Sequence, residues 1–233
     1  MNEAVIQNRV EEDARRTFEV VSGGGIAIIP LDVAYAILGR TEAAIKRIFA
    51  AKRRSYEKPS GLFACLDHSL DLHVLGDRDR EIQRTLIDEF DLPFSTIAPF
   101  RRDHPMLAGV DPFVLESSTK AGTMDMLLNA GPLHSALAKL SHAEATPLFG
   151  SSANLSLTGS KFTLDDIEPE IRAIADIEID HGRCKYANEE GVSSTIVDFR
   201  DFSVVRRGCC FETLSGVFRD RFDIELDDGG ETA

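Results

Sequence analysis

The chain has 233 residues, of which 43 % are hydrophobic and 28 % are charged, and its formal net charge is −13. This balance is typical of a globular protein with enough apolar material for a core, and it excludes disorder as the overall state. The longest apolar run, near residues 25–30, is far shorter than the roughly 20 residues that a transmembrane helix needs. The acidic balance also argues against a broad basic surface for duplex DNA or RNA.

The four cysteines, Cys65, Cys184, Cys209 and Cys210, include no C-x-x-C pair, and the adjacent pair is a poor pattern for a disulfide or for zinc. Residues 1–16 are acidic and contain no apolar core, unlike a signal or transit peptide. These features predict a protein of a reducing compartment, the cytoplasm, without a membrane attachment.

Helical and strand patterns alternate along the chain, which predicts one α/β domain with an open, twisted, mixed sheet and flanking helices. Apolar residues at helical spacing predict helices over residues 4–21, 41–49, 78–90, 133–140, 167–174 and 214–218. Short apolar or β-branched runs predict strands over residues 26–29, 61–66, 94–98, 147–150, 177–179, 194–198 and 202–205. The domain is expected to cover residues 1–226, followed by an acidic flexible tail at 227–233, whereas residues 101–131 give no clear pattern.

A basic segment follows the second predicted helix. Lys52, Arg53, Arg54 and Lys58 place four cations within seven residues of an otherwise acidic chain. Because the segment leads into a strand, it is expected at an edge of the sheet. Cations there would neutralise a phosphate or a carboxylate, and arginine offers a planar pair of N–H donors. An ordinary solvated loop is the alternative.

Small polar residues lie beside three further predicted strands. Residues 149–156 end a strand in Ser152 and Asn154, whose side chains and backbone N–H groups suit phosphate or carboxylate recognition. A turn held by its own side chains is the alternative. Ser194 leads into another strand and Arg206 follows the next, which could bring hydroxyls and a guanidinium to one edge; ordinary strand and turn chemistry is the alternative here.

Several common catalytic patterns are absent from the sequence. The six histidines show no spacing typical of metal ligands, and neither a G-x-S-x-G nor a G-x-x-x-x-G-K-[ST] motif occurs. A metal hydrolase, a serine hydrolase and a P-loop nucleotidase are therefore unsupported, and no metal-ligating residues are predicted.

Taken in order, the segments resemble the YrdC/YciO family. The family pattern is roughly P-T-D-T-x-Y-G-L, K-x-R-P-x-x-K-P, T-S-A-N-x-S-G, S-T-V-V-D and R-P-G. The chain has P-L-D-V-A-Y-A-I at 30–37, K-R-R-S-Y-E-K-P at 52–59, S-S-A-N-L-S-L at 151–157, S-T-I-V-D at 194–198 and R-R-G at 206–208. The resemblance spans residues 20–210, and five motifs in order make it specific although each is weak alone.

The resemblance implies a YrdC-like sheet around a positively charged cavity and the activity of a threonylcarbamoyl-AMP synthase, a nucleotidyltransferase. In that reaction L-threonine and bicarbonate give a carbamate, which attacks the α-phosphate of ATP and releases pyrophosphate. Such a site mainly positions anionic reactants, with Mg²⁺ shielding their charge. The product normally serves, through partner proteins, to modify adenosine 37 of certain tRNAs.

The resemblance also implies which residues form the site. Lys52 and Arg54 would be the catalytic cations and, with Lys58, would hold the phosphates and the substrate carboxylate. The nucleotide and substrate would further contact Tyr35, which lines the cavity, Ser152 and Asn154, which bind phosphate oxygens or the adenylate, Ser194, which faces the nucleotide, and Arg206, which clamps it.

The chain departs from the family pattern on the amino-acid side of the cavity. Leu31 and Val33 replace both threonines of the first motif, Ala36 replaces its glycine, and no arginine occurs over residues 121–127, where the family carries an R-x-P segment. Arg101 and Arg102 are candidates to replace that arginine. Two alternative functions follow: a YrdC-like protein that binds a nucleotide or double-stranded RNA without synthesis, or an enzyme that transfers a carbamoyl group to another acceptor.

Overall fold

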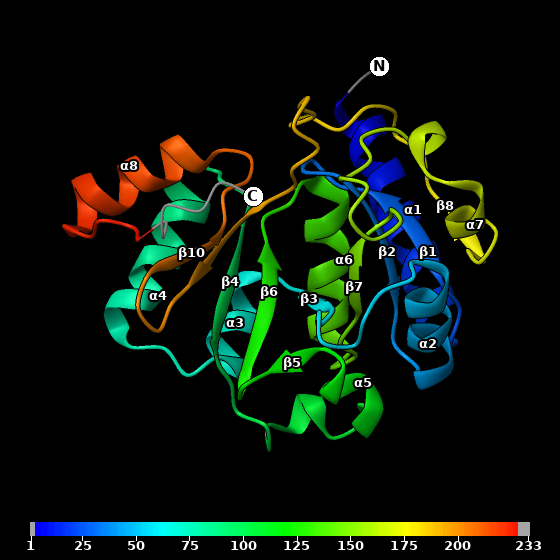
Figure 1. The fold of residues 1–233 in the computed structure, drawn as a ribbon, viewed down its shortest axis with the longest axis horizontal. Coiled ribbons are helices and arrows are strands. Elements are labelled where there is room, and N and C mark those ends of the chain that lie inside the picture. The colour runs from blue at the N-terminus through cyan, green and yellow to red at the C-terminus, as the bar shows by residue number, and fades with distance from the viewer. Residues whose placement is uncertain (1–2, 228–233) are drawn as a thin grey trace.

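The computed structural model describes residues 3–227, in which ten strands join one mixed sheet (Figure 1). Nine of them follow one another in the order β10-β9-β4-β6-β3-β7-β2-β1-β8, and β5 pairs with β6 outside this path. The strands are β1 (Ala27–Pro30), β2 (Tyr35–Gly39), β3 (Gly61–Phe63), β4 (Phe94–Pro99), β5 (Thr119–Lys120), β6 (Thr123–Leu128), β7 (Phe149–Ser152), β8 (Ile177–Glu178), β9 (Thr195–Asp198) and β10 (Ser203–Arg206).

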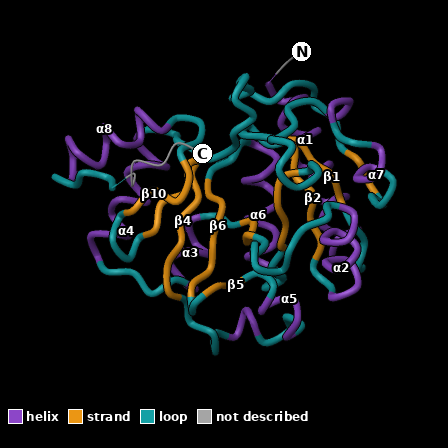
Figure 2. Tube along the Cα trace, in the orientation of Figure 1, coloured by secondary structure: helices purple, strands orange, loops and turns teal. Residues whose placement is uncertain are grey.

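Helices surround the sheet, with the strands gathered at the centre of the molecule (Figure 2). A π-helical turn, Thr85–Glu89, continues α4, and short 3₁₀ turns lie at Pro105–Leu107 and Leu164–Asp166. The helices are α1 (Glu3–Ser22), α2 (Glu42–Ala51), α3 (Leu66–Leu72), α4 (Asp77–Arg84), α5 (Pro112–Glu116), α6 (Pro132–Ala143), α7 (Pro169–Arg172) and α8 (Phe211–Phe222).

Local chemistry explains several of the boundaries. The glycine run ends α1, because Gly24 has a φ of 93° and the N–H of Gly25 donates to the carbonyl of Val20. The hydroxyl of Thr41 accepts from the N–H of Ala44 and so caps α2. The β-branched run that follows the glycines is β1, fully buried between β2 and β8.

The core forms two apolar clusters on the sheet. One cluster joins α1 and α6 to alternate residues of β1 and β2, such as Ala27 and Ala36. The other joins α2, α4 and α8 to the intervening residues, such as Ile28 and Ile37. Because successive side chains of a strand point to opposite faces, the two clusters lie on opposite sides of the sheet.

The predicted alternation of helices and strands and the predicted fold class are confirmed. The strand predicted over 61–66 is shorter, because Leu66 already begins α3. The unpatterned stretch 101–131 contains α5, β5 and β6, and β6 is a central strand of the sheet.

The chain beyond α8 returns to the sheet. The N–H of Val204 donates to the carbonyl of Asp227, 2.6 Å away, so the first residue of the predicted tail lies against β10. The remainder of that tail, residues 228–233, lies outside the described residues. Within residues 3–227 no helix is long and apolar enough to cross a membrane.

Candidate functional site

A cavity of about 760 Å³ lies on the sheet and is closed by the loops that follow α2 and α5. β6 turns Thr123, Asp125 and Leu127 to the cavity, and the residues between them pack in the core on the other face. This alternation follows from the two-residue period of a strand. The strands beyond β6 contribute Ser95, Ile97, Ser194, Ile196, Asp198 and Arg206.

Two arginines from distant segments lie at this cavity. Arg54 donates from Nε to the carbonyl of Lys58 at 2.9 Å and from Nη2 to that of Pro59 at 2.8 Å. Arg206 donates from Nε and Nη2 to the carbonyl of Ser194 at 3.0 and 2.7 Å. These bonds fix both guanidinium groups, and Nη1 of either arginine donates to no other residue of 3–227, so its N–H groups can serve a ligand.

Burial and neighbouring charges shift the pKa values of both arginines. Burial lowers the pKa of Arg54, and the charge of Arg206 lowers it further. Burial likewise lowers the pKa of Arg206, and Asp125 opposes both shifts. Two cations that line one cavity favour an anionic ligand, such as a phosphate or a carboxylate.

Asp125 is a carboxylate that the sequence motifs did not indicate. Burial raises its pKa to about 6, against the opposing effects of Arg206, a hydrogen bond from Ser95, and Arg54. Its Oδ1 is buried and has no hydrogen-bond partner among residues 3–227. A Cβ at Gly61 would lie 3.4 Å from Oδ2, so the glycine leaves room beside the carboxylate.

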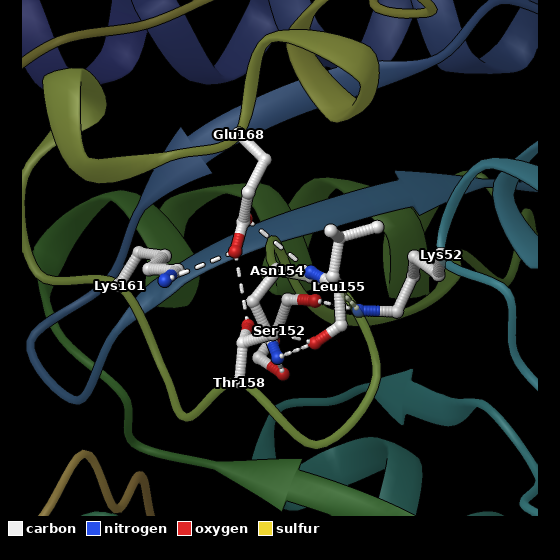
Figure 3. A network of polar contacts seen from close by, with 7 residues as sticks. All are labelled: Lys52, Ser152, Asn154, Leu155, Thr158, Lys161 and Glu168. Atoms are coloured by element: carbon white, nitrogen blue, oxygen red, sulfur yellow. Dashed lines mark hydrogen bonds and ion pairs between the residues drawn. The ribbon is translucent and has the colours of Figure 1, made fainter.

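Lys52 is placed behind the cavity wall. Figure 3 shows its side chain pointing at the loop after β7, where Nζ donates to the carbonyl oxygens of Ser152 and Asn154, the latter at 2.6 Å. Burial lowers the pKa of Lys52 to about 7, with a contribution from Arg54 and an opposing one from Glu168. We therefore assign Lys52 a positioning role in place of the phosphate contact expected from the sequence.

The same loop, residues 152–158, is held by its own side chains. The hydroxyl of Ser152 donates to Oδ1 of Asn154, and Nδ2 of Asn154 donates to the carbonyl of Leu155 (Figure 3). Ser152 lines the cavity, but the buried side chain of Asn154 does not. The contacts of Asn154 agree with the alternative prediction for this segment, a turn held by its own side chains, rather than with a phosphate contact.

Glu168 anchors the far side of this loop. Its carboxylate accepts from the N–H of Leu155 at 3.3 Å and from the hydroxyl of Thr158 at 2.9 Å, and it pairs with Lys161 at 3.0 Å (Figure 3). Burial would raise the pKa of Glu168, but these hydrogen bonds outweigh it and lower the pKa. The loop is thus fixed from two sides, by Lys52 and by Glu168.

The R-R-G segment, residues 206–208, packs directly on the backbone of Ser193 and Ser194, just before β9. A Cβ at Gly208 would lie 2.2 Å from the carbonyl oxygen of Ser193, so only glycine allows this approach. The N–H of Gly208 donates to the hydroxyl of Thr195 at 3.1 Å, and that of Cys209 donates to the carbonyl of Ser193 at 2.8 Å. This contact sets the position of Ser194 opposite Arg206.

Tyr35 contributes to the cavity wall, but its hydroxyl is engaged elsewhere. The phenolic oxygen lies 2.7 Å from Oδ1 of Asp180 and 2.9 Å from the carbonyl of Gly182. Burial and the bond to Asp180 raise the pKa of the phenol. The tyrosine thus ties β2 to the segment after β8.

One end of the cavity is apolar. Leu31, Ala36, Phe63 and Leu127 line it, and all four belong to the apolar cluster under α6. Val33, at the other altered position of the first motif, is buried and does not reach the cavity.

The two candidates for a replacement arginine lie away from the cavity. Arg101 donates from Nη1 to the carbonyls of Asp71 and His73, at 2.7 and 2.5 Å. Arg102 is exposed, and neither arginine lines the cavity. The apolar end therefore has no guanidinium from either of them.

The cavity offers few ligands for Mg²⁺, which the resemblance implies. Among residues 3–227 no three His, Cys, Asp or Glu side chains gather into a metal site. Asp198, one of the cavity carboxylates, is already paired with Arg200 at 2.6 Å. The protein alone therefore offers Mg²⁺ no cage, and the ion would have to be held chiefly by the phosphates of a nucleotide.

The structure brings most of the predicted site residues together. Lys52 and Asn154 lie behind the wall, and the missed Asp125 and Ser95 were hidden in strands without a motif. The residues that line the cavity as predicted are Tyr35, Arg54, Lys58, Ser152, Ser194 and Arg206. Their ligands remain predictions.

The fold and the cavity define a class: an α/β protein whose mixed sheet carries an arginine-lined pocket. The Sua5/YciO/YrdC family model, described as "Telomere recombination", matches residues 19–208, and the chain therefore belongs to this family. A protein of Methanocaldococcus jannaschii with the provisional name threonylcarbamoyl-AMP synthase is 24 % identical over 206 residues, 84 % of this chain and 86 % of its own.

Solved structures share the fold at low identity. The hypothetical protein smu.1377c of Streptococcus mutans matches with a TM-score of 0.77 and 20 % identity, over 90 % of this chain and 92 % of its own. Sua5 of P. abyssi, in a complex with L-threonine, matches with a TM-score of 0.72 and 20 % identity over 96 % of this chain. The match spans 62 % of Sua5, so Sua5 is the longer protein.

Proposed function

We propose that the protein binds ATP and a small amino acid in its cavity and joins them, through bicarbonate, into a carbamoyl adenylate. The amine and bicarbonate give a carbamate and water, the carbamate oxygen attacks the α-phosphorus of ATP, and pyrophosphate leaves. The provisional activity of the M. jannaschii relative and the threonine complex of Sua5 support this reaction class.

The observation that carries the proposal is the convergence of Arg54 and Arg206 on one cavity. The two residues are 152 positions apart, and in both Nε and Nη2 donate to backbone carbonyls while Nη1 has no partner among the described residues. Oriented cations of this kind stabilise charge that develops on a transferring phosphoryl group. The volume of about 760 Å³ lies in the range of about 300–1,000 Å³ that small-molecule sites occupy.

The remaining residues of the proposal position the reactants. Ser152 and Ser194 would donate hydroxyls to phosphate oxygens, and Lys58, exposed at the cavity mouth, would meet the outer phosphates. Mg²⁺ would enter with ATP and shield its charge. The adenylate would then pass to partner proteins that modify tRNA, and the net charge of −13 argues for such a partner rather than for extended RNA binding by this chain.

The test is pyrophosphate release from ATP with Mg²⁺ and bicarbonate, with and without a panel of amino acids, together with mass spectrometry of the adenylate. Arg54→Ala is expected to reduce turnover by about tenfold to a hundredfold or more, the value of a lost charge-assisted contact. Arg102→Ala removes an exposed arginine outside the cavity and serves as the matched control.

ATP binding without pyrophosphate release under any of these conditions would overturn the proposed synthesis and favour a protein that only binds a nucleotide. Release that depends on an amine other than an amino acid would instead favour carbamoyl transfer to another acceptor. An Arg54→Ala variant with unchanged turnover would remove Arg54 from the site.

A further inference from the structure

The cavity is divided into a charged part and an apolar part along a single strand. Asp125 and Leu127 are two residues apart on β6, which places their side chains on one face about 6.6 Å apart. In the parallel register Phe63 of β3 lies beside Leu127, and Gly61 lies beside Asp125. A carboxylate and an apolar wall therefore meet within the length of one amino acid.

We propose that this part of the cavity selects an aliphatic α-amino acid, with the amine on Asp125, the carboxylate on the arginines and the side chain against Leu31, Phe63 and Leu127. The inference rests on the proposed function for the use of that amino acid, but not for its binding. It assigns Asp125 a role that none of the sequence motifs indicated.

The argument for the amine begins with Oδ1 of Asp125. This atom is buried without a hydrogen-bond partner among residues 3–227, which costs free energy, and the same carboxylate lines the cavity, where a ligand can supply a donor. A phosphate or a carboxylate would be repelled there, whereas an ammonium group supplies both the proton and the opposite charge. Gly61 leaves the carboxylate uncovered by a side chain from the neighbouring strand.

The argument for the aliphatic side chain is the composition of the wall. Leu31 and Phe63 are buried, and with Ala36 and Leu127 they present no hydrogen-bonding side chain to the cavity. A hydroxyl buried against them would lose its bonds to water without replacement. Valine and threonine have nearly the same shape, so the wall distinguishes them through the methyl and the hydroxyl alone.

The carboxylate completes the arrangement. Arg54 and Arg206 line the same cavity as Asp125, so a molecule with its amine on Asp125 can turn its carboxylate towards the guanidinium groups. A zwitterion suits this mixture of one anion and two cations better than a ligand of either charge alone. The remaining positive charge stays available for the phosphates of ATP.

Binding is measured first, because it does not depend on turnover. Isothermal titration calorimetry or ligand-observed NMR compares L-valine, L-leucine, L-threonine and L-serine with the full-length protein, with and without Mg²⁺–ATP. We expect L-valine to bind about 10- to 100-fold more tightly than L-threonine, the discrimination that an apolar pocket achieves against a hydroxyl isostere. Threonine binding as tightly as valine would overturn the inference.

The amine contact is tested with a variant and a ligand that each lack one partner. Asp125→Asn is expected to weaken L-valine roughly tenfold to a hundredfold. The same substitution should not weaken 3-methylbutanoate, which has the carboxylate and side chain of valine without the amine. Asp103→Asn, an exposed aspartate outside the cavity, is the matched control.

The outcomes separate this inference from the proposed function. Tight valine binding without pyrophosphate release would retain the amino-acid site and reject the synthesis. Threonine-dependent release with weak valine binding would retain the synthesis and reject the aliphatic preference. Equal loss of valine and 3-methylbutanoate in Asp125→Asn would show that Asp125 only shapes the cavity, and would reject the amine contact.

Discussion

Arg206 holds the carbonyl oxygen of Ser194 with two N–H groups of one guanidinium, at 3.0 and 2.7 Å. A third bond, 3.2 Å long, runs from Nη2 to the hydroxyl of the same serine. Arg206, the last residue of β10, thus fixes the residue that leads into β9, and both residues line the cavity. A change at Arg206 is therefore expected to affect the ligand and the strand together.

Arg206→Lys tests whether the forked geometry matters beyond the charge. Lysine keeps a cation but cannot donate two parallel bonds to one carbonyl while presenting another N–H to a ligand. We expect ATP affinity to fall by roughly tenfold or more, with a smaller loss of stability than in Arg206→Ala. Calorimetric titration with Mg²⁺–ATP measures the first effect and thermal unfolding the second; a lysine variant with unchanged ATP affinity would show that charge alone suffices.

Gly208→Ala is expected to destabilise the protein by about 1–3 kcal/mol, the usual range for forced overpacking. Its Cβ would meet three backbone atoms of Ser193 and Ser194 within 2.5 Å, none of which can move without displacing β9. Gly109→Ala is the matched control, because a Cβ there meets nothing within 4 Å, and its effect should stay within about 0.5 kcal/mol. Equal unfolding midpoints of the two variants in urea would contradict the close packing.

Lys52→Met is expected to destabilise the protein by about 1–3 kcal/mol, because two buried carbonyls lose their donor while the length of the side chain is kept. The pH dependence gives a sharper signature. Burial places the pKa of Lys52 at about 7, below the ordinary value near 10.4, so the unfolded chain binds more protons between these values. The stability that involves Lys52 therefore rises as the pH increases from about 7 towards 10.

The measurement is urea unfolding of wild type and Lys52→Met at several pH values between 6 and 10. The difference in unfolding free energy between the two proteins should grow with pH, because the neutral amine still donates two N–H groups without a buried charge. A difference that does not grow over this range would mean that Lys52 stays charged in the folded protein.

Glu168→Gln is expected to loosen the loop of residues 152–158. The variant loses the ion pair with Lys161 and weakens the bonds from Leu155 and Thr158, for a cost of about 1 kcal/mol. Because the pKa of Glu168 is lowered on folding, its contribution is present above its unfolded pKa and is lost as the pH falls through the folded value. Amide hydrogen exchange should accelerate in the loop, and it should not change in the exposed control Glu12→Gln.

Many elements with a regular pattern could be predicted from the sequence, but β2, α3 and β6 were missed, and β6 shows one reason. Its residues alternate between the cavity and the core, but Asp125 is a poor strand former, and methionine and leucine give no β-branched signal. The strand is stabilised by pairing with β4 and β3 rather than by its own composition. Asp125 was missed with it, since no motif surrounds it.

The site residues were predicted best where a motif fixes the backbone. Arg54 and Arg206 reach the cavity as expected, but Lys52, two residues before Arg54, points elsewhere. Arg53 between them has a φ of 51°, a left-handed conformation that reverses the direction of the chain just after α2. Spacing alone could not reveal that turn, because arginine rarely adopts it.

The cavity is lined both by β10, at one end of the sheet, and by β2, near the other end. These two strands lie far apart in the sequence, so the cavity forms only when the whole sheet is assembled. A ligand that binds only the folded sheet stabilises the folded state of the whole domain. At a concentration 100-fold above its dissociation constant it would add about 2.7 kcal/mol to the free energy of unfolding. Strands that never touch the ligand would share in this protection, and slowed amide exchange in β1 would then report occupancy of a pocket to which β1 contributes no side chain.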